Sequence, residues 1–378
     1  ECEFGDVAVL VKDTCSPISC NESHYIGLEH IEQESLRLTS IGKSTDVTSN
    51  KFRFKKNDIL FGKLRPYYRK VVKPNFDGIC STDIWVVRAK KDIEQNFLYY
   101  FIANWDFVNI ANGGEAGTRM PRADWNFVKK TVWEFPPLSE QRAIASVLSS
   151  LDDKIDLLHR QNATLEKMAE TLFRQWFVEE AKEEWEETIL YDVIELVGGG
   201  TPKTSVYEYW NGDICWLSGG DIATNHKSFV SASEKNITEL GLKNSSARLL
   251  PQFSTLISAR GTVGKFCMLS KPMAFSQSNY GIKPKYQDCY FFTYLLINHS
   301  VAELQSAAYG SVFDTITTNT FKSYTINLPD FNYIKEFDNF VNPYFLRMKA
   351  NQEQIRTLTT LRDTLLPKLM SGEVKIKI

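Results

Sequence analysis

"TLTTLRDTLLPKLMSGE", residues 357–373, has the spacing of an amphipathic helix, and a looser copy, "ATLEKMAETLFRQWFVEE", occupies residues 163–180. Leu165 aligns with Leu358, which is a shift of 193 residues. Three further pairs have the same shift: Pro136 and Pro329, Ser139 and Asn332, and Leu172 and Leu365. Ser and Asn are good helix N-caps just after a proline-marked loop, so both helices have the same predicted start. The chain therefore repeats one helix about half a chain apart.

The segments ahead of the two helices repeat more faintly but in the same order. "FGDVAVL" (4–10) is matched by "LYDVIEL" (190–196), "DILFGKLRP" (58–66) by "STLISARGT" (254–262), and "CSTD" (80–83) by "SQSN" (276–279). Each segment alternates β-branched and aromatic runs with Gly, Pro, Asn and Asp turns. We therefore predict two mixed α/β domains, 1–136 and 186–330, each followed by a long helical segment, 137–185 and 331–378.

Composition supports two cores and leaves the function open. The chain has 378 residues, of which 43% are hydrophobic and 13% aromatic. A net charge of −2 and a pI near 6.3 do not favour nucleic acid, although basic residues gathered on one face would still allow it. Seven cysteines without a CxxC pair and five scattered histidines predict no metal site and reduced thiols in a cytoplasmic protein. No apolar run reaches the ~18–20 residues of a membrane span, so no membrane partner is expected.

The helical segments carry heptad rows. From Ile144 the apolar positions step by four and three: Ile144, Leu148, Leu151, Ile155, Leu158, Asn162, Leu165, Ala169, Leu172 and Trp176. The shift of 193 gives the second row: Phe337, Val341, Tyr344, Met348, Asn351, Ile355, Leu358, Arg362, Leu365 and Leu369. Arg362 is an exception to the apolar pattern. Pro343 predicts either a kink or a restart with Asn342 as cap.

A 40-residue helix is roughly 60 Å long, too long for a compact domain to bury alone. We expect the two helices to pair antiparallel as a coiled-coil spacer, with Asn162 facing Asn351 in a polar layer that sets the register. The alternative is two separate core helices. The final "SGEVKIKI" is expected to add a strand through Val374, Ile376 and Ile378 to the first domain. The predicted architecture is two similar α/β domains on an antiparallel helical spacer, with approximate two-fold symmetry.

Several motifs resemble one protein family over nearly the whole chain. "PPLSEQRAIASVLSSLDDKI" (136–155), "TLEKMAETLFRQWFV" (164–178) and "TLRDTLLPKLMSGEV" (360–374) resemble the two conserved regions of the specificity subunit of type I restriction–modification systems. "FGKLRPYYRKV", "SARGTVGK" and "GGGTP" resemble motifs of that family's target-recognition domains.

The resemblance implies a subunit without catalytic activity. Such a subunit recognises a gapped, asymmetric sequence in double-stranded DNA, with one half read by each domain. Its paired helices set the gap and dock two methyltransferase subunits, which bind S-adenosylmethionine and methylate adenine. Restriction subunits that translocate DNA with ATP then join. On this basis the chain itself is expected to bind no cofactor.

Candidate DNA-binding residues follow from side-chain chemistry. Lys and Arg neutralise phosphates, and planar Arg can bond guanine edges in the major groove. The candidates in the first domain are Lys51, Arg53, Lys63, Arg65, Tyr67, Tyr68, Arg69, Lys70, Arg119 and Arg122. A solvated basic strand face would give the same pattern.

The second domain is less basic, which predicts a different half-site. Its candidates are Thr201, Lys203, Arg260, Thr262, Lys265, Gln277, Asn279 and Ser311. Gln277 and Asn279 could bond adenine edges, or could cap turns at strand ends. Three bulky residues near the end of the first helix, Phe173, Trp176 and Phe177, are expected either to dock a partner or to pack against the domains.

Enzyme motifs are incomplete. "NPYF" (342–345) lacks the second proline of the element by which amino-methyltransferases hold their target amine, and no cofactor loop precedes it. "GGGTP" has no following Lys-Ser/Thr and is not a phosphate-binding loop. We therefore expect no catalytic residues. The competing hypotheses are a self-contained DNA methyltransferase and a coiled-coil scaffold or dimerisation protein.

Overall fold

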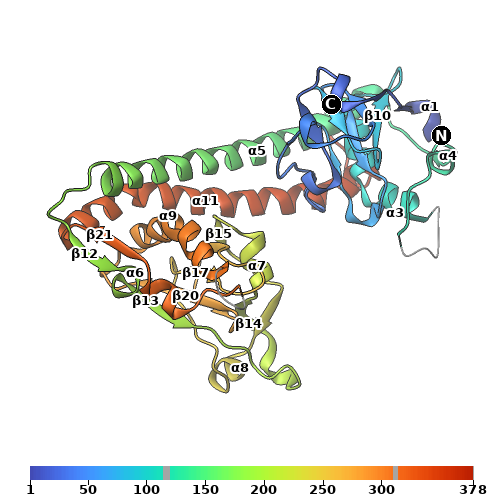
Figure 1. Ribbon diagram of the computed structural model, residues 1–378. Helices are drawn as coiled ribbons and strands as arrows, with labels where there is room; N and C mark the ends of the chain where they lie inside the picture. The colour runs from blue at the N-terminus through green and yellow to red at the C-terminus, as the bar shows by residue number, and fades with distance from the viewer. Residues whose placement is uncertain (114–119, 310–313, 378) are drawn as a thin grey trace. The chain divides into compact units, whose positions relative to one another are not determined.

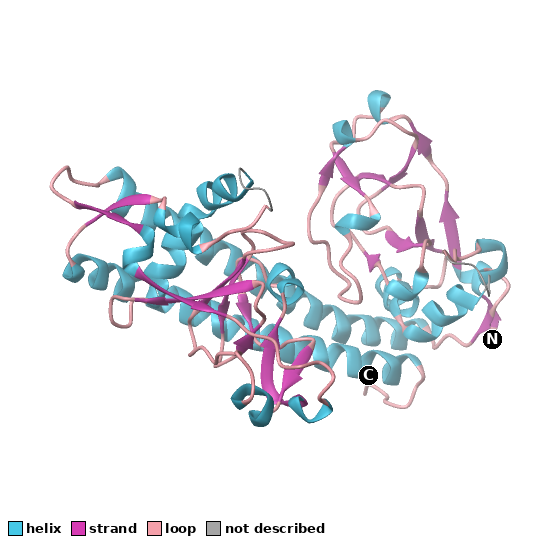
Figure 2. Cartoon of the chain, turned by 60° about the horizontal axis from the view of Figure 1, so that its bottom comes forward, coloured by secondary structure: helices cyan, strands magenta, loops and turns pink. Residues whose placement is uncertain are grey.

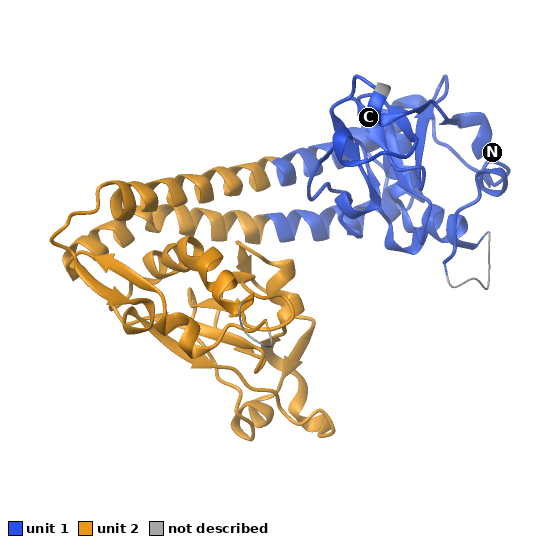
Figure 3. Cartoon of the chain, viewed as in Figure 1, with its two compact units in different colours: residues 1–156, 355–378 blue, residues 157–354 orange. Residues whose placement is uncertain are grey.

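The computed structural model describes residues 1–113, 120–309 and 314–377. The chain forms two compact units, which Figure 3 shows in different colours. Unit 1 comprises residues 1–156 and 355–378, and unit 2 comprises residues 157–354. Two long helices, α5 (Leu138–Arg174) and α11 (Phe331–Met370), contribute to both units. Within the described ranges, no helix combines the length and apolar character needed to cross a membrane.

Unit 1 is a mixed α/β fold with two main sheets. Its strands are β1 (Cys2–Glu3), β2 (Ala8–Val11), β3 (Thr14–Cys15), β4 (His24–Ile26), β5 (Gly42–Lys43), β6 (Lys51–Phe54), β7 (Ile59–Gly62), β8 (Val71–Val72), β9 (Gly78–Cys80), β10 (Ile84–Ala89) and β11 (Val132–Trp133). One sheet has the order β2-β10-β7-β8 and the other β3-β6-β9-β4-β5, while β1 pairs with β11. The short helices are α1 (Phe4–Val7), α2 (Gln95–Ala103), α3 (Trp105–Gly113) and α4 (Trp125–Val128).

Unit 2 repeats this plan (Figures 1 and 2). Its strands are β12 (Glu186–Ile189), β13 (Ile194–Gly198), β14 (Trp210–Leu217), β15 (Phe229–Val230), β16 (Lys235–Ile237), β17 (Thr255–Ser258), β18 (Phe266–Leu269), β19 (Ala274–Phe275), β20 (Asn279–Pro284) and β21 (Thr325–Leu328). The sheets have the orders β13-β20-β17-β18-β15, β16-β14-β19 and β12-β21. The helices are α6 (Leu190–Val193), α7 (Gly219–Thr224), α8 (Glu239–Lys243), α9 (Tyr290–Tyr309) and α10 (Thr318–Lys322).

Matching hydrogen bonds reveal the repeat at the level of single residues. At the start of each unit the N–H of Phe4 donates to Thr131 O, and that of Leu190 donates to Tyr324 O, both at 2.9 Å. In the turn before the central strand, Ser81 N donates to Ile26 O and Ser276 N donates to Leu217 O, again at 2.9 Å. The equivalent of Ser276 is therefore Ser81, one residue later than the match of "CSTD" with "SQSN" predicted.

The long helices belong to the cores of the units. In unit 1, Ile144 and Leu148 of α5 lie in one apolar cluster with Leu366 and Leu369 of α11. In unit 2 the cluster contains Ala169 and Phe173 of α5 together with Phe337 and Val341 of α11. All twenty positions of the two predicted rows are buried or half-buried. Removing these apolar surfaces from water stabilises each unit and its helices together.

The helices run antiparallel where they meet in unit 2. Asn351 Nδ2 donates to Asn162 Oδ1 at 2.8 Å, and Asn162 Nδ2 donates to Met348 O at 3.3 Å. Further along, the Trp176 ring contacts the Phe337 ring, so residue numbers rise on α5 while they fall on α11. The predicted contact between the two asparagines is present.

Arg362, the exception in the second row, is buried by forming an ion pair. Only 2% of the residue is exposed, and its Nη1 lies 2.8 Å from Asp152 Oδ1 of α5. The same nitrogen donates to Ser35 O at 3.2 Å. A buried guanidinium is tolerated when a carboxylate and a carbonyl replace its water.

Two predicted helix caps were wrong, and of the two alternatives at Pro343 the restart was wrong. Asp330, not Asn332, caps α11, because Asp330 Oδ1 accepts the N–H of Asn332 at 2.8 Å. Ser139 is not a cap either, since α5 begins at Leu138. The helix does not restart at Pro343: α11 is continuous from Phe331 to Met370. Pro343 is exposed, where water can satisfy the backbone carbonyl that its missing N–H would otherwise engage.

The C-terminal tail forms no strand between Ser371 and Lys377, contrary to expectation. Ile376 instead packs against the core of unit 1. The N-terminal strand β1 pairs with β11, as β12 pairs with β21 in unit 2. The N-terminal strand β1 therefore takes the place beside β11 that a strand from the tail could have taken. Ile378, the last residue of the expected strand, lies outside the described residues.

The asparagine pair provides a test of the helix pairing. Asn351→Leu leaves Asn162 without its buried partner and should lower the free energy of unfolding by about 1–3 kcal/mol. Replacing both residues by Leu should recover most of this loss, because no polar group is then stranded. Urea unfolding of the two single variants and the double variant measures the coupling. If the double variant lost as much free energy of unfolding as the two single variants together, the predicted coupling between the asparagines would be contradicted.

Candidate nucleic-acid interface

In unit 1, the loop between β7 and β8 brings together basic residues from distant parts of the chain. Arg65 N donates to Pro121 O at 2.8 Å, and Ala123 N donates to Lys63 O at 2.9 Å. Leu64 and Arg122 form an isolated bridge between the same two segments. The backbone therefore places Lys63, Arg65 and Arg122 side by side.

An exposed cation of the segment 121–123 and an exposed aromatic ring of the β7–β8 loop lie on these two segments, whereas Lys63 and Arg65 are half-buried. The Arg122 side chain is more than half exposed and lies 3.5 Å from Asp83. Tyr67 is exposed, and its ring is tilted against that of Tyr68 within the 3-10 turn Pro66–Tyr68, with 4.6 Å between the ring centroids. Guanidinium and ammonium groups bind phosphates, and planar side chains lie against bases and sugars. The surface suits the backbone and groove edge of a nucleic acid.

The β7–β8 loop and its counterpart in unit 2, the β17–β18 loop (259–265), share an unusual backbone. Left-handed residues occur at both ends: Arg65 (φ 52°) and Arg69 (φ 46°) in unit 1, Gly261 (φ 75°) and Gly264 (φ 79°) in unit 2. Glycine adopts this conformation freely, whereas arginine does so at a cost of roughly 1–2 kcal/mol. Two left-handed positions thus occur in both loops, with different side chains, and the unit 2 loop is shorter.

In unit 2 the β17–β18 loop lies beside the end of β20. Ser258 pairs with Asn279, and Ala259 N donates to Ser278 O at 3.0 Å. This register places Arg260 next to Gln277, and both are exposed. Thr262 Oγ1 donates to Gly219 O at 3.2 Å. Arg260 and Gln277, both candidates from the sequence, are thus brought together, whereas the hydroxyl of Thr262, a third candidate, is engaged within the chain.

The "GGGTP" segment lies against the same strand end. Gly200 N donates to Phe275 O at 3.0 Å, and a Cβ at Gly199 would lie 2.1 Å from Ser276 O. Only glycine permits this close approach. Thr201 therefore follows directly from a segment packed beside Gln277, while Lys203 is exposed.

Several predicted contacts are wrong because the side chains are buried. Lys51 Nζ is held by Ser49 O at 2.8 Å. Arg69, of which 3% is exposed, donates through Nε to Ala103 O at 2.6 Å. Asn279, 1% exposed, donates to Ser276 Oγ at 2.8 Å, so its role is that of a turn residue.

Other candidates have partners within the chain or cannot be placed. Arg53 lies 3.4 Å from Asp13 and 3.2 Å from Glu22, and Lys70 Nζ donates to Leu28 O. Lys265 is exposed beside β18. Arg119 and Ser311 lie outside the described residues.

Phe173 and Phe177 are core residues, not docking residues. They are 3% and 7% exposed, and their rings contact Phe292 of α9 and Phe337 of α11. The prediction that they dock a partner is therefore wrong, because unit 2 itself covers them. Trp176 is half-buried on the same cluster.

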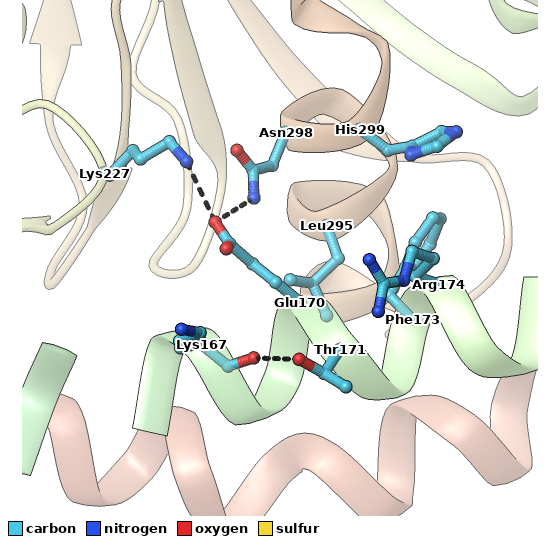
Figure 4. Close-up of a pocket in the computed structure, with 9 residues that line it drawn as sticks. All are labelled: Lys167, Glu170, Thr171, Phe173, Arg174, Lys227, Leu295, Asn298 and His299. Carbon is cyan, nitrogen blue, oxygen red and sulfur yellow. Dashed lines mark hydrogen bonds and ion pairs between the residues drawn. The ribbon is translucent and has the colours of Figure 1, made fainter. Parts of the chain in front are cut away.

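A pocket of about 420 Å³ in unit 2 is lined by an ion pair (Figure 4). Glu170 of α5 points toward Lys227 and Asn298, with Oε1 2.9 Å from Lys227 Nζ and 2.6 Å from Asn298 Nδ2. Burial opposes ionisation of Glu170, but these two donors hold its pKa below the usual range. These contacts of Glu170 join α5, α9 and the segment before β15. Among the described residues, no group of His, Cys, Asp and Glu could hold a metal ion.

The pKa of Glu166, one turn before Glu170, is shifted in the opposite direction. Burial, and then the charge of Glu170, raises the pKa of Glu166 to about 7. Its Oε1 is buried and has no hydrogen-bond partner in the described structure. The carboxyl group is therefore easier to bury when protonated.

Paired units with polar loops at corresponding sheet ends are typical of a protein that contacts nucleic acid through two non-identical surfaces. The chain matches the family of type I restriction modification DNA specificity domains over residues 3–167 and 182–359. These ranges cover most of the chain, which belongs to this family. It is a DNA sequence-recognition subunit, a non-catalytic component of type I restriction–modification complexes.

Curated relatives match most of this chain and most of their own length. The chain is 25% identical over 310 residues to the type I restriction enzyme MjaIX specificity subunit of Methanocaldococcus jannaschii, covering 76% of this chain and 71% of the relative. It is 24% identical over 402 residues to the HindI specificity subunit of Haemophilus influenzae, covering 85% and 87%. The crystal structure of a type I restriction-modification S subunit from M. genitalium has the same fold, with a TM-score of 0.60, 13% identity and coverage of 100% and 96%.

Glu166 makes the stability of unit 2 dependent on pH. Its folded pKa of about 7 exceeds the unfolded value near 4.5, so the folded state binds more protons between these values and stability falls as pH rises through them. Glu166→Gln should raise the free energy of unfolding by about 1–2 kcal/mol at pH 8 and change it little at pH 4.5.

Urea unfolding at the two pH values measures this difference. Glu353→Gln, at an exposed carboxylate of α11, is the control and should give the same small change at both. An equal effect of Glu166→Gln at pH 4.5 and pH 8 would show that burial does not shift its titration.

Proposed function

We propose that each unit reads one half of a bipartite, gapped DNA sequence through its end loop. The observation that carries this proposal is that corresponding loops of the two units, each with two left-handed residues, carry different side chains. Unit 1 presents Lys63, Arg65 and Arg122, while unit 2 presents Arg260 and Gln277. Cations favour phosphates and guanine, whereas an amide favours adenine, so the two half-sites differ.

The helices α5 and α11 form the spacer between the half-sites in this proposal. The recognition domains are residues 1–136 and 186–330, and the helical segments 137–185 and 331–378 form an antiparallel coiled coil with approximate two-fold symmetry. Support comes from the burial of both rows and from the contact between Asn162 and Asn351. A polar pair inside an apolar seam fixes register, and register sets the gap.

Methyltransferase and restriction subunits are the proposed protein partners. The names of the curated relatives, specificity subunits of type I restriction enzymes, support this proposal. The proposed complex acts in the cytoplasm. S-adenosylmethionine and ATP would bind to those partners. Because Phe173 and Phe177 are buried, they are not the residues that bind these partner subunits. The proposed docking residues are exposed apolar side chains of α5 and α11, such as Met168 and Leu346.

Sequencing of methylated bases in cells that carry the complete system tests the proposal. The expected motif has two different half-sites separated by a gap of constant length. A continuous motif, or methyl transfer by the purified chain alone with S-adenosylmethionine, would contradict it.

Single substitutions assign each unit to its half-site. Gln277→Ala should relax discrimination at one position of one half by about tenfold, and Arg122→Ala should act only on the other half, because each removes a contact of about 1–3 kcal/mol. Methylation rates on duplexes with single base-pair changes give both ratios. Arg356→Ala, at an exposed position of α11, serves as the control. If both variants lost discrimination in the same half-site, the assignment of one half-site to each unit would be refuted.

A further inference from the structure

Arg69 ends the β7–β8 loop of unit 1 with its side chain turned inward. Its Nε donates to Ala103 O at 2.6 Å and its Nη1 to Glu34 O at 3.4 Å. The guanidinium also lies over the Trp105 ring, 5.3 Å from the centroid. Every face of this cation is therefore occupied by the protein, and none is free for DNA.

The remaining partner of Arg69 lies on the long helix α11. Arg69 Nη2 is 3.6 Å from Asp363 Oδ1, and the same oxygen is 3.1 Å from Arg362 Nη2. Arg362 in turn pairs with Asp152 of α5 at 2.8 Å, and Asp152 Oδ2 accepts the hydroxyl of Tyr100 at 2.7 Å. A continuous charged network thus joins the loop to both long helices within unit 1.

This network holds Arg69 in an unfavourable backbone conformation. A left-handed arginine is strained and persists only where its surroundings hold it. The equivalent position in unit 2 is Gly264, which adopts the conformation without strain. There the loop is fastened by Gln305 of α9, whose Nε2 donates to Val263 O at 2.8 Å. Unit 2 holds its loop from α9, whereas unit 1 holds its loop from α2 and α3 and, in addition, from α11.

We propose that Arg69 and Asp363 are positioning residues that set the DNA-reading geometry of the β7–β8 loop from the long helix α11. The inference rests on the proposed function of that loop. Sequence discrimination by unit 1 then depends on a carboxylate of the helical spacer that touches no base. Discrimination by unit 2 has no such dependence on the equivalent residue of α5.

That equivalent residue is Glu170, 193 positions before Asp363. Glu170 is also held by a cation, Lys227, which lies in the same unit 2 (Figure 4). Neither Lys227 nor its other partner, Asn298, belongs to the β17–β18 loop. Glu170→Gln therefore removes a matched carboxylate without releasing a loop, and it is the control.

The test compares Asp363→Asn and Arg69→Gly with the control in the complex with the methyltransferase subunits. Methylation rates are measured on the cognate duplex and on duplexes with one base pair changed in either half. Both variants should reduce discrimination in the half read by unit 1 by about tenfold, and in the other half by less than about twofold. Glu170→Gln should change neither ratio. Thermal unfolding confirms that the variants are folded; glycine suits the backbone of residue 69, and Asp363→Asn keeps the shape of the side chain.

Salt dependence separates positioning from direct contact. Because Arg69 is buried, the slope of log affinity against log salt should not change in either variant, whereas loss of a phosphate contact would reduce it by about 0.9. A reduced slope would overturn the inference, as would equal losses in both halves or unchanged discrimination in folded variants. A wild-type complex that discriminates in neither half would instead overturn the proposed function, and the inference with it.

Discussion

The pairing of α5 with α11 is the constraint on which the rest of the structure depends. A helix of about 60 Å cannot bury an apolar row without a partner of similar length. Each unit therefore builds its core around a section of both helices: Leu148 and Leu366 in unit 1, Phe173 and Phe337 in unit 2. The α/β units are not appended to finished helices, because the same apolar surfaces stabilise both.

Polar groups inside this pairing supply specificity rather than stability. Asn351 satisfies Asn162, and Arg362 satisfies Asp152, so a shifted alignment of the helices would strand buried amides and charges. Apolar contacts alone would tolerate such a shift. The position of the unit 1 loop relative to α11 follows from the same network, since Asp363 pairs with both Arg362 and Arg69.

The candidate site was only partly predictable. Repeated motifs located both loops, and the exposure of Arg122, Arg260 and Gln277 agrees with their proposed roles. Lys51, Arg69 and Asn279 were misassigned because charge and amide chemistry do not reveal side-chain direction. Arg69 turns inward at a left-handed residue, and Asn279 closes a turn with Ser276.

The sequence by itself determined the internal repeat, the two long helices and the facing asparagines, because these depend on local periodicity and on spacing that the chain preserves. The tertiary structure alone decided which carboxylate pairs with Arg362, that Phe173 is covered, and that β1 rather than the tail completes unit 1. Those outcomes depend on burial by elements more than a hundred residues away, and no local pattern encodes such partners.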